Sequence, residues 1–116
     1  MKVLNKIKGD VGEAEAVNFL KKHKYKILET NYKNKIGEID IIAQKGQTIC
    51  FVEVKRRQTA EFGLPREAVD RRKQQKIAKT AQIFLLQKHL TEAEISFSVV
   101  EILGHEINLI ENAFEL

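Results

Sequence analysis

Residues 36–55 alternate polar and apolar side chains on either side of a short turn that contains a glycine, and this pattern predicts a β-hairpin. The arms of the hairpin are residues 36–43 and 48–55. Side chains alternate between the two faces of a strand, so one face is apolar and consists of Ile39, Ile41, Ala43, Cys50, Val52 and Val54. The opposite face carries the charges of Glu38, Asp40, Glu53 and Lys55. Burial of the apolar face would hold this arrangement, because a slip by one residue would bury the acids.

The position of the turn decides which residues lie opposite each other. A two-residue turn at Lys45-Gly46 predicts Asp40 opposite Phe51 and Glu53 opposite Glu38. Other registers of the same parity keep the same residues on each face. The composition of the two faces is therefore the same for any of these registers.

The charged face of the hairpin has two interpretations. In the first, its carboxylates and Lys55 form cross-strand ion pairs in solvent, each worth roughly 0.2 to 1 kcal/mol. In the second, they hold a hard divalent cation and position a water beside it. Ile42 and Phe51 continue this face, so the acids border a packed surface, which favours a functional site. Because carboxylates that share such a space repel each other, we expect a raised pKa for at least one of them in the metal-free protein.

Composition limits the classes of protein that fit. With 116 residues, 43% of them hydrophobic, and a single proline, the chain is expected to form one domain, residues 1–116. It has no run of about 18 apolar residues, and charges follow its first residues, so we expect a cytoplasmic protein without a membrane span. Cys50 is the single cysteine and belongs to the apolar face, which predicts a core residue rather than a nucleophile or a metal ligand.

Basic residues are concentrated in one part of the chain. The net charge is +4, but residues 55–79 alone carry nine basic side chains: Lys55, Arg56, Arg57, Arg66, Arg71, Arg72, Lys73, Lys76 and Lys79. The same segment has three acidic residues, Glu61, Glu67 and Asp70. A basic segment that begins at the candidate cation site suits a phosphodiester substrate. The alternative is an ordinary solvated helix.

The coarse order of elements follows from periodicity and from turn signals. The sequence predicts a helix capped by Asp10 and ending near His23, a strand over Tyr25–Tyr32, the hairpin, a loop over Gln58–Leu64, a helix over Arg66–Leu90 with Pro65 in its first turn, and strands over Ile95–Leu103 and Glu106–Ile110. This order, α-β-β-β-α-β-β, predicts an α/β fold with helices packed on a mixed sheet.

The first predicted helix places an acid on its apolar side. At 100° per residue, Glu13 lies between Val17 and Leu20, whereas Glu15 lies on the opposite side. A lone buried carboxylate costs several kcal/mol unless it is paired or coordinated. Glu13 is therefore expected to face the sheet and to meet either a cation site or a basic residue of the second helix.

Together these residues resemble a known family. Glu53-Val54-Lys55, with Asp40 on the neighbouring strand, resembles the PD-(D/E)-x-K nuclease superfamily. Over nearly the whole chain the sequence is similar to the bacterial YraN family, which is likened to archaeal Holliday junction resolvases. The matching segments are Gly12-Glu13, Asn31-Tyr32, Gly37-Glu38-Ile39-Asp40, Phe51-Val52-Glu53-Val54-Lys55, Gly63, Ala68-Val69, Lys73 and Asn112-Ala113-Phe114.

The resemblance implies a restriction-endonuclease-like fold and a metal-dependent endonuclease that cuts DNA, including branched structures such as Holliday junctions, or damaged DNA. It implies that Asp40 and Glu53 ligate Mg²⁺ or Mn²⁺ with the Val54 carbonyl, that Glu13 adds a ligand, and that Lys55 acts on the attacking water and the phosphate. The residues expected to contact nucleic acid are Arg56, Arg57, Arg72, Lys73 and Lys76. Glu38 is expected to have a supporting role.

The chain departs from the family pattern at two positions. Relatives tend to carry a basic residue before the phenylalanine at 97 and an aspartate after it, whereas this chain has Ser96 and Ser98. If the two family residues form only an ion pair, activity is unaffected; if they touch substrate, activity or specificity changes. The main alternative to a nuclease is a nucleic-acid-binding module without catalysis, and an inert structural protein is third. The sequence leaves open whether a homodimer forms.

Overall fold

The computed structural model describes residues 2–57 and 70–114, with side chains from Gly12 onward. Its elements are α1 (Lys2–Lys22), β1 (Lys26–Lys33), β2 (Glu38–Lys45), β3 (Thr48–Arg57), α2 (Arg71–Gln87), β4 (Glu94–Leu103) and β5 (Glu106–Ile110). The predicted order, α-β-β-β-α-β-β, is confirmed. No helix within the described residues is long and apolar enough to cross a membrane.

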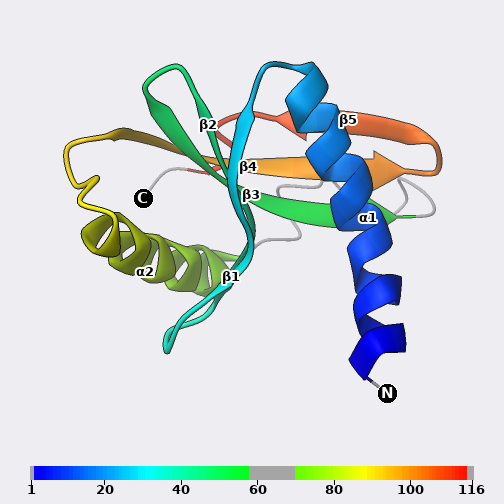
Figure 1. The fold of residues 1–116 in the computed structure, drawn as a ribbon, viewed down its shortest axis with the longest axis horizontal. Helices are drawn as coiled ribbons and strands as arrows, with labels where there is room; N and C mark the ends of the chain where they lie inside the picture. Colours follow the sequence, from blue (N-terminus) through cyan, green and yellow to red (C-terminus); the bar gives the residue numbers. More distant parts are fainter. Residues whose placement is uncertain (1, 58–69, 115–116) are drawn as a thin grey trace.

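The five strands form one mixed sheet in the order β1-β2-β3-β4-β5 (Figure 1). β3 and β4 run parallel, whereas the other neighbouring strands are antiparallel. A parallel pair needs a crossover connection, and α2 lies in the connection between β3 and β4. The sheet thus separates two apolar clusters, one packed against α1 and the other against α2.

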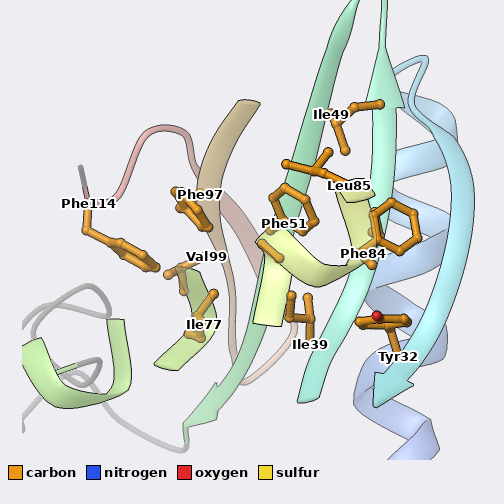
Figure 2. Close-up of a cluster of buried hydrophobic side chains, with 12 residues drawn as sticks. Tyr32, Ile39, Ile49, Phe51, Ile77, Phe84, Leu85, Phe97, Val99 and Phe114 are labelled. Atoms are coloured by element: carbon orange, nitrogen blue, oxygen red, sulfur yellow. The ribbon is translucent and has the colours of Figure 1, made fainter. Parts of the chain in front are cut away.

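The cluster beneath α2 is rich in aromatic residues (Figure 2). The ring of Phe51 from β3 packs edge-to-face on Phe84 of α2, with 6.1 Å between centroids, and stacks on Phe97 of β4 at 5.6 Å. Phe114 stacks on Phe97 at 5.1 Å and closes the end of this cluster. The helix contributes buried residues at helical spacing: Ile77, Thr80, Ala81, Phe84 and Leu85. This packing fixes α2 over the face of the sheet that carries Glu53.

Two predicted helix boundaries are wrong. α1 begins at Lys2, so Asp10 lies inside the helix and is not its cap. The preceding residues include good helix formers and no proline, so nothing in them stops the helix. α2 begins at Arg71, and its N-cap is Asp70, whose carboxylate accepts a hydrogen bond of 2.8 Å from the Lys73 backbone N–H. Pro65 and the predicted loop over Gln58–Leu64 lie outside the described residues.

The predicted hairpin exists, but its register is shifted by two. Lys45 pairs with Thr48, and Ile41 pairs with Val52, so the turn is Gly46-Gln47 rather than Lys45-Gly46. Gly46 has φ of +61°, a conformation that glycine adopts without steric cost. The shift keeps the parity of the two faces, so Asp40, Glu53 and Lys55 stay on one face as predicted. Cys50 is 5% exposed in the α1-side cluster, which confirms it as a core residue.

Alternation fails at one position of β2. Ile39 was expected on the same face as Ile41, yet it packs with Tyr32 in the cluster beneath α2. Asn31, which lies in β1 between the partners of these two isoleucines, has φ of +52°. A left-handed residue interrupts the extended chain, and the end of the β1–β2 hairpin consequently turns toward α2.

Candidate active site on the α2 face of the sheet

Asp40 and Glu53 come together just beyond the last paired residues of β2 and β3. Asp40 directly precedes Ile41, and Glu53 directly follows Val52, the residue with which Ile41 is paired. The Val54 backbone N–H donates a hydrogen bond of 2.8 Å to Asp40 Oδ2, which holds that carboxylate against β3. The predicted pairs of Asp40 with Phe51 and of Glu53 with Glu38 are thus replaced by direct proximity of the two acids.

Glu53 is a buried acid with a strongly perturbed titration. Glu53 is only 6% exposed to solvent. Burial raises its pKa to about 8, and a hydrogen bond with Asp40 and repulsion from that carboxylate add to the rise. The ammonium groups of Lys73 and Lys55 oppose it. The expected raised pKa of one clustered acid is confirmed, with burial as the main cause rather than charge repulsion.

Two lysines from different elements meet beside Glu53. Burial lowers the pKa of Lys55 on β3, and a hydrogen bond and charge repulsion from Lys73 of α2 lower it further, while Glu53 and Asp40 raise it. Sequence reasoning assigned Lys73 to binding of the DNA backbone. The structure places it within the same electrostatic cluster as the two acids. The position of Lys73 depends on the first turn of α2, because Asp70 caps that turn by accepting a hydrogen bond from the Lys73 backbone N–H.

A basic cavity of about 480 Å³ adjoins this group. Its walls come from the β1–β2 turn and from the first turns of α2: Lys33, Gly37, Glu38, Asp70, Arg72, Lys73, Lys76, Ile77 and Thr80. A Cβ on Gly37 would lie 3.0 Å from Thr80 Oγ1, so glycine permits the close approach of the turn to the helix. Three residues predicted to bind nucleic acid, Arg72, Lys73 and Lys76, thus line one hollow.

Two further predicted site residues, Glu13 and Arg56, contact other elements. Glu13 Oε2 accepts a hydrogen bond of 2.8 Å from the Asn31 side-chain amide, so Glu13 faces β1. Asn31 lies between the β1 residues that pair with Ile39 and Ile41. Arg56 is on the α1 side of the sheet, where its guanidinium lies 3.7 Å from Glu15. The Glu15 side chain in this pair is 39% exposed.

Arg57 and Glu38 complete the set of predicted residues. Arg57 ends β3 and is half-buried. Glu38 is exposed at the start of β2 and lines the basic cavity. The supporting role expected for Glu38 stays a prediction.

The two serines that depart from the family pattern lie on the other face of the sheet from Glu53. Ser96 donates a hydrogen bond of 3.1 Å to Cys50 Sγ, and Ser98 is 3% exposed. Both line a cavity of about 670 Å³ with Tyr25 and Glu111, whose side chains are joined by a 3.1 Å hydrogen bond. Cys50 and Tyr25 belong to the α1-side cluster, so the departure falls on the face of the sheet opposite to Glu53.

Sequence reasoning missed two residues that shape the site. Asn31 carries both the left-handed turn in β1 and the contact to Glu13. Asn34 ties the β1–β2 turn to α2 by donating to the Thr80 carbonyl at 3.2 Å. The only available signal was their residue type, because asparagine tolerates left-handed conformations and stabilises turns.

The residues present fit a hard divalent cation. A carboxylate pair with oxygen ligands suits Mg²⁺ or Mn²⁺, and Mg²⁺ is commonly held by one or two carboxylates together with substrate phosphates. Burial raises the pKa of Glu53 to about 8 and so disfavours its charged form, and a bound cation would compensate that charge. Within residues 2–57 and 70–114, no three acids, cysteines or histidines are placed to share one ion. Glu13 as an added ligand stays a prediction.

Comparison with known proteins gives a consistent result. The chain is 49% identical to a UPF0102 protein of Geotalea daltonii, covering 97% of this chain and 92% of the relative. It is 47% identical to one of Acetivibrio thermocellus, covering 91% and 89%, and 42% identical to one of Persephonella marina, covering 95% of each. The model of the uncharacterised protein family UPF0102 matches residues 12–102. With its sequence matched over most of its length and the expected fold observed, the chain belongs to UPF0102, the YraN family.

Proposed function

We propose that this protein is a metal-dependent endonuclease that hydrolyses DNA phosphodiester bonds. The observation that carries this proposal is the convergence of Asp40, Glu53, Lys55 and Lys73 from β2, β3 and α2. Two acids beside two amines match the needs of phosphodiester hydrolysis, which requires charge compensation at the phosphate and a group that handles the proton of the attacking water.

Each residue has a distinct role in this proposal. Asp40 and Glu53 would hold Mg²⁺ or Mn²⁺, which supplies Lewis-acid chemistry when bound. The lowered pKa of Lys55 increases its neutral fraction, and a neutral amine can accept a proton from water. Lys73 stays next to Lys55 and would compensate the negative charge that develops on the phosphate.

The basic cavity supports DNA as the substrate. Lys33, Arg72, Lys73 and Lys76 outnumber the two acids on its walls, Glu38 and Asp70, and Asp70 is engaged as the cap of α2. A hollow with net positive charge attracts the phosphodiester backbone regardless of base sequence. Because the cavity shares Lys73 with the catalytic cluster, a strand held there would pass beside the acids.

The alternative function is a nucleic-acid-binding module on the same fold. Its support is that no third carboxylate joins Asp40 and Glu53 within the described residues. A module of this kind would bind DNA through the basic cavity without cutting it. Against it, a binder gains nothing from two acids beside phosphates, which they repel.

The decisive experiment offers the purified protein linear, single-stranded, flapped and four-way DNA with Mg²⁺ or Mn²⁺. The Lys55→Ala variant, purified identically, controls for contaminating nuclease. We expect cleavage by the wild type, with Lys55→Ala keeping DNA and Mg²⁺ binding but losing cleavage. Asp40→Asn should lose Mg²⁺ affinity as well. Equal cleavage by the wild type and Lys55→Ala, or tight binding without any cleavage, would reject the nuclease and leave the binding module.

A further inference from the structure

The turn between β1 and β2 projects beyond the sheet beside α2 (Figure 1). We propose that this turn, residues 33–37, is a wedge that inserts Ile36 into DNA at a branch point or at a distorted base step. This inference rests on the proposed function, since it assigns a substrate class to the same site. It depends on three observations: how the turn is held, what it exposes and where it lies.

Hydrogen bonds of Asn34 hold the turn. Asn34 Oδ1 accepts hydrogen bonds from the backbone N–H groups of Ile36, at 2.9 Å, and Gly37, at 3.4 Å. Its Nδ2 donates to Tyr32 Oη at 3.0 Å and to the Thr80 carbonyl at 3.2 Å. A backbone bond of 3.0 Å from Asn34 N–H to the Gly37 carbonyl closes the loop. The turn is thereby fastened to α2 and pre-organised, which lowers the entropy cost of binding.

The exposed side of the turn combines an apolar side chain with positive charge. Ile36 is 38% exposed, one of three large apolar residues exposed within the described part of the chain. Lys33 and Lys35 are exposed nearby, and the basic cavity with Lys76 opens beside the turn. An isolated exposed isoleucine is common on protein surfaces. An isoleucine held on a fastened turn among lysines has the composition of the apolar wedges that DNA-bending proteins insert between base steps.

The distance from the turn to the acids fits one DNA segment. Ile36 precedes Asp40 by four residues, so an extended chain rising about 3.3 Å per residue separates them by at most about 13 Å. Stacked bases along one strand are about 3.4 Å apart. The wedge would therefore act within about four nucleotides of the bond at the acids.

This placement predicts a preference for DNA whose stacking is already broken. Inserting a side chain between stacked bases costs unstacking energy, and this cost is smaller at a branch point or a flexible step. Ile36 would add little to binding of a regular duplex, for which the lysines supply the affinity. The wedge thus converts a general attraction for phosphate into selectivity for branched or distorted DNA.

The test compares Ile36→Ala with Ile95→Ala, which alters another exposed isoleucine, 44% exposed at the start of β4. Binding is measured by fluorescence anisotropy on a four-way junction and on a linear duplex of the same sequence, without divalent metal so that the strands stay intact. A 2-aminopurine beside the branch reports unstacking. Thermal melting followed by circular dichroism verifies that both variants are folded.

We expect wild type and Ile95→Ala to prefer the junction and to raise 2-aminopurine fluorescence. Ile36→Ala should lose about tenfold of its junction affinity, change duplex affinity by less than about twofold, and lose the fluorescence rise. Ile36→Leu should retain both properties.

Junction preference and unstacking unchanged in Ile36→Ala would overturn the wedge, while cleavage dependent on Lys55 in the same protein would leave the nuclease standing. The reverse outcome, a wedge effect with no cleavage, would support the wedge and refute the enzyme. A wild-type protein that binds neither DNA overturns the wedge.

Discussion

The buried acid Glu53 makes the stability of the metal-free protein depend on pH in an unusual direction. Because its pKa is about 8 in the folded protein and about 4.3 in an unfolded chain, the folded state retains a proton between these values that the unfolded state releases. Stability therefore falls as pH rises through this window. From pH 5 to pH 8 the free energy of unfolding should fall by about 3 to 4 kcal/mol, from about 1.4 kcal/mol for each pKa unit.

The other groups with shifted pKa values act at higher pH or in the opposite direction. Burial raises the pKa of Cys50 above its ordinary value, so its destabilising effect also begins at higher pH. Burial raises the pKa of Tyr25 to about 12, so its destabilising effect begins above its ordinary pKa of about 10. The lowered pKa of Lys55 makes stability rise with pH, in the window between its folded pKa and its ordinary value near 10.4. A fall in stability between pH 5 and 8 is thus assigned to Glu53.

The assay is urea unfolding at about five pH values in the presence of EDTA, for the wild type and for Glu53→Gln. Glutamine keeps the shape of the side chain but cannot release a proton, so the variant should lose most of the fall. Added Mg²⁺ should stabilise the wild type more at pH 8 than at pH 5, since cation binding competes with the proton. Constant stability of the wild type over this range would refute the assignment of a raised pKa to Glu53. An equal fall in the stability of Glu53→Gln would refute it as well.

Three further outcomes follow from the packing, the cap and the basic cavity. Phe84→Ala should cost about 3 to 5 kcal/mol in urea unfolding because its ring is 2% exposed beneath α2, whereas Leu86→Ala, at a position 63% exposed, should cost under about 0.5 kcal/mol; equal costs would contradict the core assignment. Asp70→Ala should lower stability by about 1 kcal/mol through loss of the N-cap, and an unchanged unfolding midpoint would show that this cap contributes little. Lys73→Ala should reduce the slope of log affinity for DNA against log salt by about one, with Lys88→Ala, at the other end of α2, as the unchanged control; similar slopes for both variants would remove Lys73 from the DNA contact.

The fold was largely predictable because its signals are local. Alternation in residues 36–55 marked the hairpin and its charged face, and the stripe containing Ile77, Phe84 and Leu85 marked the second helix. Helix ends were less predictable. Asp10 and Asp70 are both good N-cap residues by type. Only the backbone around each residue decides which of them caps the start of a helix.

The sequence by itself determined that Asp40, Glu53 and Lys55 share one face of a hairpin, because side-chain alternation depends only on the extended backbone. Tertiary structure decided how that face works. Packing of Phe84 on Phe51 set α2 over the acids and brought Lys73 to Lys55. It also buried Glu53, and the cost of removing a charge from water is a property of everything packed around it. No pattern within one strand or one helix contains that information, because the atoms that displace the water come from distant parts of the chain.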